Sequence, residues 1–313
     1  MSRRYLKLSM AEFRSGMVAL VGKPNVGKST LINALLGWKY SIVSPKPQTT
    51  RKCTRYVITR SLGGQIVFID TPGLHKALHL LGKAMEKQLC DVMEKVDLVC
   101  YIVDARTRNL GSEDAVMIER MKKNSKAPVV LVINKIDLAD NPSEAKERLV
   151  SLYGQEINIK AAVTLSALTG EGVGEFVDTV IKMLPEGDLL YPPEFVGDFT
   201  EKFVAEEIIR EKILEETEQE VPHSVAVVIE EFKSPEEYPQ RDTLFIRADI
   251  YVERQGQKGI LIGKGGRMLK KIGKKAREEI EKQFGYPAYL DLWVKVRPGW
   301  RNSERELRRM GYL

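Results

Sequence analysis

Gly22-Lys-Pro-Asn-Val-Gly-Lys-Ser-Thr30 is the stretch of sequence that decides how this 313-residue chain folds. The apolar run at residues 17–21 precedes it and predicts a buried strand, whereas the helix formers at residues 29–36 follow it. Gly37 is placed to end that helix. A glycine-rich turn between a strand and a helix directs backbone N–H groups and the positive end of the helix dipole at one point. The stretch therefore predicts a phosphate-binding loop.

The chemistry of such a loop assigns roles to its last residues. Lys28 is expected to reach the β- and γ-phosphates of a nucleotide, and the Ser29 hydroxyl is expected to hold Mg²⁺. The other residues of the loop that we expect to contact the nucleotide are Gly22, Lys23, Pro24, Asn25, Val26, Gly27 and Thr30.

A second apolar run, residues 65–69, leads into Asp70-Thr71-Pro72-Gly73. An Asp at the carboxyl end of a strand can hold Mg²⁺ through water. Gly73 lets the backbone approach a γ-phosphate closely, so its N–H can detect whether that group is present. We therefore expect all four residues to contact the nucleotide. The alternative is an ordinary Pro-Gly turn after a strand.

Leu74, which we also expect to lie against the nucleotide, occupies the position where Ras-like enzymes carry a Gln that orients the attacking water. A Leu side chain cannot hydrogen-bond water. The water must then be positioned by another bound water, by a partner or by a cation.

A third apolar run, residues 128–133, leads into Asn134-Lys135-Ile-Asp137. A carboxylate only accepts hydrogen bonds and guanine offers two adjacent donors, so Asp137 predicts guanine rather than adenine. Asn134 is expected to tie loops together, and the Lys135 stem to lie over the base. By itself this motif is also compatible with a helix N-cap after a strand.

Ser166 and Ala167 follow the apolar residues 163–165, and the Ala167 N–H is expected to meet guanine O6. These motifs occur together in the order and spacing of a guanine-nucleotide-binding domain. The sequence therefore predicts a GTPase that uses GTP, GDP and Mg²⁺.

The stretch Pro47-Gln-Thr-Thr-Arg51 supplies a mobile Thr for Mg²⁺ and the γ-phosphate. Thr50 is favoured over Thr49, because the Thr before the Arg fills that role in similar proteins. A polar surface loop is the alternative. The residues expected to act in hydrolysis are then Lys28, Thr50 and Gly73, and those expected to hold the metal are Ser29, Thr50 and Asp70.

Strands and helices alternate from residue 17 to 184, which predicts an α/β domain with a mostly parallel sheet and helices on both faces. Proline and glycine at residues 185–193 predict a stiff linker. We expect a basic extension at 1–16, a nucleotide-binding domain at 17–184, a linker at 185–197 and a second domain at 198–313.

The net charge of +6 conceals a strong separation in the second domain. Residues 198–253 hold 16 acidic and 6 basic side chains, and residues 254–313 hold 16 basic and 6 acidic ones. Such a separation presents one positive surface, which is the electrostatic footprint of a polyanion partner.

Helix and strand patterns in the second domain follow the order α-β-β-α-α-β, with Gly263-Lys-Gly-Gly266 between the paired helices. This order matches a small α+β KH domain of the prokaryotic type (type II). Its GxxG loop clamps four nucleotides of single-stranded RNA. A GxxG by itself is weak evidence for RNA binding. The alternative interpretation is an ordinary turn between two helices.

The residue pattern of the helix expected at 267–284 favours the RNA-binding interpretation. Leu269, Ile272, Ala276 and Ile280 share one face, and basic residues occupy the opposite face. Basic residues are often merely solvated, but five of them starting at the GxxG indicate phosphate contacts. The residues expected to bind RNA are Gly263, Lys264, Gly265, Gly266, Arg267, Lys270, Lys271 and Lys274.

Trp300 and Tyr312 lie in a basic tail, where they could stack on a base or pin the tail to the sheet. The three cysteines lack metal-ligand spacing, which fits a reducing cytoplasm. The basic N-terminus lacks the apolar stretch of a secretion signal, and no run is long enough for a membrane span.

A GTPase domain joined to a KH domain resembles the Era family of bacterial ribosome-assembly GTPases. The likeness covers nearly the whole chain and includes Pro-Asn-Val-Gly-Lys-Ser-Thr at 24–30, Gln-Thr-Thr-Arg at 48–51, Asp-Thr-Pro-Gly-Leu-His at 70–75, Glu-Ile-Ile-Arg-Glu-Lys at 207–212 and Leu-Trp-Val-Lys-Val at 292–296. The chain departs from the family by its 16-residue lead-in and by Leu168, where Lys often closes the motif.

The resemblance implies binding near the 3′ end of small-subunit (16S) ribosomal RNA and a role in assembly of the 30S subunit. RNA would be bound in the GTP state and released in the GDP state. Asn25 matches the Asn that holds K⁺ in potassium-activated relatives, although it could equally make local backbone hydrogen bonds. We expect a cytoplasmic monomer. Peripheral contact with the cytoplasmic face of the inner membrane is compatible with this function. The alternative function is a GTPase switch whose basic C-terminal domain docks on an anionic membrane surface or a protein partner.

Overall fold

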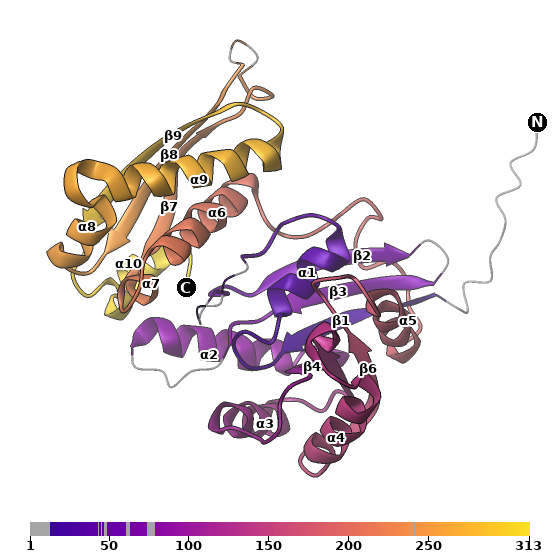
Figure 1. Cartoon of the computed structure of the whole chain (residues 1–313). Coiled ribbons are helices and arrows are strands. Elements are labelled where there is room, and N and C mark those ends of the chain that lie inside the picture. The colour runs from indigo at the N-terminus through magenta and orange to yellow at the C-terminus, as the bar shows by residue number, and fades with distance from the viewer. Residues whose placement is uncertain are drawn as a thin grey trace, which may run out of the picture. The chain divides into compact units, whose positions relative to one another are not determined.

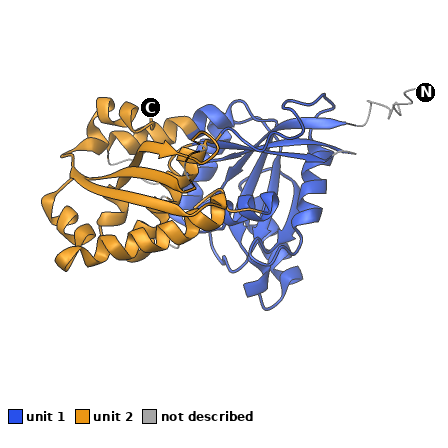
Figure 2. Cartoon of the chain, turned by 90° about the horizontal axis from the view of Figure 1, so that it is seen from above, with its two compact units in different colours: residues 1–37, 53–71, 89–198 blue, residues 38–52, 72–88, 199–313 orange. Residues whose placement is uncertain are grey.

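The computed structural model describes residues 13–42, 44, 46, 49–60, 63–73, 79–238, 240 and 242–313. The chain divides into two compact units (Figure 2). Unit 1 consists of residues 1–37, 53–71 and 89–198, and unit 2 of residues 38–52, 72–88 and 199–313. Two short stretches that interrupt the first domain in sequence, 38–52 and 72–88, thus belong to unit 2.

Unit 1 contains a six-stranded sheet in the order β2-β3-β1-β4-β5-β6. Among the described strands, β2 and β3 pair antiparallel, and the other neighbours pair parallel. Buried parallel strands read as continuous apolar runs, which is why the sequence pattern predicted them. The strands are β1 (Arg14–Val21), β2 (Thr54–Arg60), β3 (Gly64–Asp70), β4 (Leu98–Asp104), β5 (Val129–Asn134) and β6 (Ile159–Leu165).

Helices connect these strands, as is typical of an α/β fold, except that β3 follows β2 directly (Figure 1). The first of them ends at Gly37, whose φ of 67° gives the left-handed conformation of the predicted stop. The helical elements are α1 (Lys28–Leu36), α2 (Leu80–Met93), α3 (Ser112–Asn124), the short 3₁₀ helix η2 (Ile136–Leu138), α4 (Pro142–Gly154) and α5 (Val173–Met183). Helix α2 begins in unit 2 and ends in unit 1.

The stretch from residue 185 to 197, predicted as a linker, is hydrogen-bonded to the sheet of unit 1. Val57 N donates to Val196 O (2.8 Å). The Gln65 side chain donates to Tyr191 O (2.8 Å) and accepts from the Tyr191 N–H (2.9 Å). Along this length the connector is therefore part of the first unit rather than a loose tether.

Unit 2 contains a three-stranded sheet in the order β7-β8-β9, with β7–β8 antiparallel and β8–β9 parallel. Helices α6 and α9 lie side by side across one face of it (Figure 1). The elements are α6 (Glu201–Glu216), α7 (Val221–Ser224), β7 (Ala226–Lys233), β8 (Leu244–Val252), α8 (Gln255–Ile262), the 3₁₀ helix η3 (Lys264–Gly266), α9 (Arg267–Phe284), β9 (Ala288–Val296), the 3₁₀ helix η4 (Trp300–Asn302) and α10 (Glu304–Arg309). The predicted order of helices and strands is confirmed, with α7 and the tail elements added.

The C-terminal tail folds back onto unit 2. Trp300 is fully buried, and its indole Nε1–H donates to Ser224 O (2.9 Å). Its ring stacks on Tyr312 at 6.0 Å, beside Tyr251. The sequence left two roles open for Trp300 and Tyr312, stacking on a base or pinning the tail. In the structure both residues pin the tail.

Candidate nucleotide site and nucleic-acid interface

The phosphate loop connects β1 to α1 and holds its lysine inside. Lys28 is 7% exposed, and its ammonium donates to Gly22 O (2.8 Å) and Lys23 O (3.0 Å). Burial lowers the pKa of Lys28 to about 8, and attraction to Asp70 opposes part of that shift. The ammonium therefore lies within the loop that is expected to receive the phosphates.

Lys23, which the sequence predicts to contact the nucleotide, directs its side chain into unit 1. Its ammonium forms an ion pair with Asp114 (2.7 Å), a fully buried residue in the first turn of α3. Asp114 also accepts hydrogen bonds from Gly111 N (2.9 Å), the Tyr153 hydroxyl (2.9 Å) and the Tyr101 hydroxyl (3.3 Å). The Lys23 side chain thus anchors the phosphate loop to the body of unit 1.

Asn134, at the end of β5, joins two loops, the role suggested by the sequence. Its side-chain amide donates to Val26 O (2.7 Å), and its Oδ1 accepts from the Ala167 N–H (2.9 Å). The Ala167 N–H was the group expected to meet guanine O6. Because that hydrogen is already donated to Asn134, a contact with guanine would have to share it. Ser166 is fully buried, and its hydroxyl accepts from Thr169 N (3.2 Å).

Lys135 is tied to both the phosphate loop and β4. Its ammonium donates to Asn25 O (2.6 Å) and pairs with Asp104 (3.0 Å). Arg106 holds the same carboxylate through two hydrogen bonds (2.8 and 3.0 Å). Burial would raise the pKa of Asp104, but the hydrogen bonds from Arg106 and Lys135 outweigh it and hold that pKa well below its usual range. Two residues further on, Asp137 is exposed and open to a ligand.

The oxygen groups of unit 1 predicted to hold the metal fit Mg²⁺. Ser29 is 8% exposed in the first turn of α1, and Asp70 is 1% exposed at the end of β3. Thr71, next to Asp70, donates its hydroxyl to Leu20 O (2.7 Å), which fixes the chain after the strand. Hydroxyl and carboxylate oxygens are the ligands that Mg²⁺ prefers.

The remaining predicted nucleotide contacts are not in unit 1. Thr50, Pro72 and Gly73 belong to unit 2. Leu74 lies outside the described residues, as do Pro47 and Gln48. Their roles stay predictions from the sequence.

The GxxG loop forms η3 between α8 and α9. Lys264 and Gly265 are exposed, and Gly265 has a φ of 61°. A Cβ atom added at Gly265 would meet nothing within 4 Å. The outer side of the loop is therefore open to an approaching ligand backbone.

The predicted two faces of α9 are present. Ile272, Ala276 and Ile280 are fully buried on one side. The exposed side carries Arg267, Lys270, Lys271 and Lys274, all predicted to bind RNA.

Acidic side chains of α6 neutralise part of that basic face. Lys271 and the neighbouring Lys275 pair with Glu216 at 2.5 and 2.6 Å. These two hydrogen bonds hold the pKa of Glu216 below its usual value. The sequence did not predict this pairing, because α6 lies more than fifty residues earlier in the chain than α9.

Comparison with known proteins gives the family. Residues 17–135 match a family model described as a 50S ribosome-binding GTPase, and residues 220–301 match the KH domain. GTPase Era of Carboxydothermus hydrogenoformans is 45% identical over 300 residues, which cover 96% of this chain and 98% of that protein. The chain belongs to the Era family of GTPases.

Solved structures agree with this family. A crystal structure of Era in complex with MgGDPNP and nucleotides 1506–1542 of 16S ribosomal RNA has a TM-score of 0.89 at 40% identity, covering 96% of this chain and 99% of that one. A point variant of Aquifex aeolicus Era bound to GDP·AlF₄⁻ has a TM-score of 0.87 at 40% identity, with the same coverage. The predicted GTPase activity and the fold of an Era-type P-loop domain with a KH domain are confirmed.

Proposed function

We propose that this chain is a GTP-hydrolysing switch that binds single-stranded 16S ribosomal RNA near its 3′ end and assists assembly of the 30S subunit. The observation that carries the proposal is an open GxxG loop, which contains the exposed Lys264 and is followed by the exposed Arg267, in the same chain as an Era-type phosphate loop. Such a loop clamps an RNA backbone because its glycines allow close approach. The relative crystallised with 16S nucleotides supports the choice of RNA.

In the nucleotide half, Asp137 selects guanine and Lys28 contacts the β- and γ-phosphates. Ser29, Thr50 and Asp70 hold the metal. When bound, Mg²⁺ neutralises charge on the phosphates. The Gly73 N–H detects the γ-phosphate, and Asn25 provides a site for K⁺ in this proposal.

The segment with Thr50 couples the two activities. Residues 49–51, on either side of Thr50, are held within unit 2: the Arg51 guanidinium, 3% exposed, donates to Val225 O (2.5 Å), and Arg210 of α6 donates to Thr49 O. If Mg²⁺ and a γ-phosphate draw Thr50 to themselves, these anchors must rearrange. Since α6 packs against α9, nucleotide state then changes how the RNA-binding face is presented.

The direct test measures affinity for a short oligonucleotide copied from the 16S 3′ end, with a scrambled control, in GDP and in a non-hydrolysable GTP analogue. We expect sequence-selective binding that strengthens in the GTP state. The double variant Lys264→Glu, Gly265→Asp should abolish it, whereas Lys282→Glu, an exposed charge reversal at the far end of α9, should leave most of it. Equal, salt-sensitive binding to both oligonucleotides would refute the proposal.

The same variants separate RNA binding from docking on a membrane. Within the described residues, no helix has the length and apolar composition needed to cross a bilayer. Adsorption to anionic vesicles depends on overall charge and not on a GxxG loop, so the GxxG variant should weaken it no more than an equal loss of charge elsewhere on the domain would. A cytoplasmic monomer, with at most peripheral contact at the inner membrane, is the state that we propose.

A further inference from the structure

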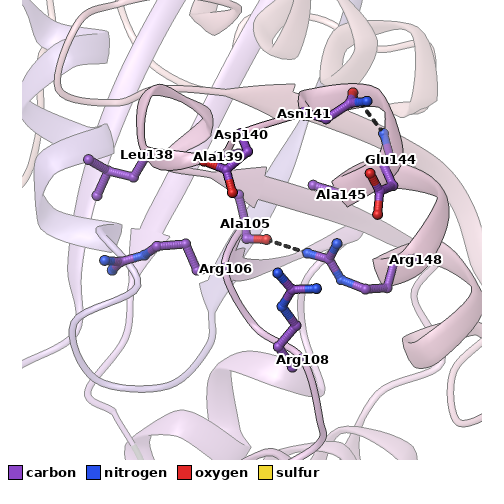
Figure 3. A pocket seen from close by; sticks show the side chains of 10 residues that line it. All are labelled: Ala105, Arg106, Arg108, Leu138, Ala139, Asp140, Asn141, Glu144, Ala145 and Arg148. Atoms are coloured by element: carbon purple, nitrogen blue, oxygen red, sulfur yellow. Dashed lines mark hydrogen bonds between the residues drawn. The ribbon is translucent and has the colours of Figure 1, made fainter.

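A pocket of about 230 Å³ lies in unit 1 where the loop after β4 meets the start of α4 (Figure 3). Three arginines, Arg106, Arg108 and Arg148, line one side of it. Asp140, Asn141 and Glu144 line the other. The pocket begins one residue after Asp137, at Leu138, so it adjoins the loop expected to recognise guanine.

Two of these arginines lack a counter-charge. Arg148 donates one guanidinium hydrogen to Ala105 O (2.8 Å), but its Nε–H is buried without an acceptor. In the described part of the chain, no carboxylate lies within ion-pairing distance of Arg108 or Arg148. Buried donors without acceptors are unfavourable and rare in native proteins. Arg106, by contrast, is already engaged by Asp104.

We propose that this pocket binds a small oxyanion, a phosphate or a carboxylate, between Arg108 and Arg148. The planar guanidinium fork matches the oxygen atoms of both groups. The volume is below the roughly 300–1,000 Å³ of pockets for drug-sized ligands, which restricts the ligand to a small ion. Asp140 and Glu144 repel the anion from the opposite side and confine it to the arginine side.

The pocket is connected to the nucleotide loops through Arg106. Arg106 binds Asp104, Asp104 also binds Lys135, and Lys135 donates to Asn25 O in the phosphate loop. An anion held between Arg108 and Arg148 also attracts Arg106, which lines the same pocket, away from Asp104. Asp104 then holds Lys135 more tightly. Anion binding therefore steadies these loops and slows release of GDP. This coupling rests on the proposed role of the loops in nucleotide binding.

Calorimetric titration of the full-length, GDP-loaded protein with inorganic phosphate at constant ionic strength tests the site. Bound GDP fills the phosphate loop apart from its γ-phosphate position, and the arginine variants below separate the pocket from that position. We expect saturable binding that is lost in Arg108→Ala and in Arg148→Ala. It should persist in Lys146→Ala, which removes one positive charge from the same helix outside the pocket. A parallel titration with succinate tells a carboxylate ligand from a phosphate.

Arg108 is exposed, so its removal should not impair folding. Absence of saturable binding in the unaltered protein, or binding that survives both arginine variants, would overturn the proposal.

Release of a fluorescent GDP analogue tests the coupling. Saturating phosphate should slow release by up to about fivefold in the unaltered protein and have no effect in Arg108→Ala. An unchanged rate with intact phosphate binding would overturn the coupling alone. Failure of the protein to bind GDP at all would instead refute the proposed function.

Discussion

The two glycine-rich loops of this chain, residues 22–30 and 263–266, are both predicted to meet phosphate, yet they are built in opposite ways. A Cβ added at Gly27 would lie 2.2 Å from the Asn134 amide nitrogen, which is itself held by the Val26 carbonyl. A Cβ at Gly265 would meet only open space. The first loop needs glycine because the protein packs against it, and the second because a ligand must approach it.

The difference follows from what each loop is expected to bind. A nucleotide enters a fixed cradle, in which donors must be in position before binding. An RNA strand arrives from solvent and lies across an exposed surface. The first loop is therefore held in its binding conformation by contacts within the protein. The second loop is instead left exposed, so that an RNA strand can reach it.

Alanine at each loop should give the largest contrast. Gly27→Ala should lower the free energy of unfolding by about 3 kcal/mol, because the new methyl group overlaps a pinned side chain at a φ of 99°. Gly265→Ala should cost only about 1 kcal/mol, the strain of its left-handed backbone. Urea unfolding of the two variants measures this difference. Equal losses would mean that the loops are not built differently.

Removing the ion pair between Lys23 and Asp114 should have the second-largest effect on stability. Lys23→Met leaves the Asp114 carboxylate buried without its cation, which should cost about 2 kcal/mol of stability and weaken GDP binding. Lys23→Arg should retain most of both properties, because it keeps the charge. In the double variant Lys23→Met, Asp114→Asn stability should partly recover, but GDP affinity should not. Full recovery of GDP affinity would show that the anchor does not position the loop.

The pH dependence of GDP binding probes the buried ammonium. With its pKa lowered to about 8, Lys28 loses its proton in the empty protein as the pH rises through 8. The unfolded chain keeps that proton to about pH 10.5, so the empty protein gains stability between these values. Phosphates favour the charged form, so GDP binding takes up a proton in this range. Affinity should be up to about tenfold weaker at pH 9 than at pH 7, as measured by titration calorimetry in buffers of different ionisation enthalpy. A GDP affinity that does not change between pH 7 and pH 9 would contradict this role of the Lys28 ammonium.

The smallest expected effect is a difference in RNA affinity between variants of two lysines on α9. Lys270→Ala should weaken RNA binding and reduce the slope of log affinity against log salt by about 0.7, as loss of one phosphate contact with a single strand does. Lys271→Ala should change the slope less, because its ammonium is paired with Glu216. Salt titrations of RNA affinity distinguish them. An equal change in slope would mean that RNA displaces Glu216.

Much of this molecule could be predicted from sequence because its motifs are local. The residues from Gly22 to Thr30, and the helix from Arg267 to Phe284, carry their own turn, cap and periodicity signals. The structure therefore reproduces these elements to within a residue. For the connector at 185–197, composition indicates stiffness but not what the segment packs against.

Partners fixed by tertiary packing could not be predicted. Asp114 is 91 positions from Lys23, and no periodicity relates an acid on α3 to a lysine before α1. The anchoring of Arg51 on Val225 O is of the same kind. For Trp300 the sequence could name two roles, and only the packing of the tail decides between them.

The connector on the sheet of unit 1 has a consequence for self-association. β2 is one of the two edge strands of the six-stranded sheet, and exposed edges can pair with strands of other molecules. Here Gly197 forms an antiparallel bridge with Tyr56, and the flanking hydrogen bonds engage Val57 N and Arg55 O. The segment that joins the two halves of the chain thus also shields this edge from aggregation, so a chain cut short before residue 196 would be exposed to it.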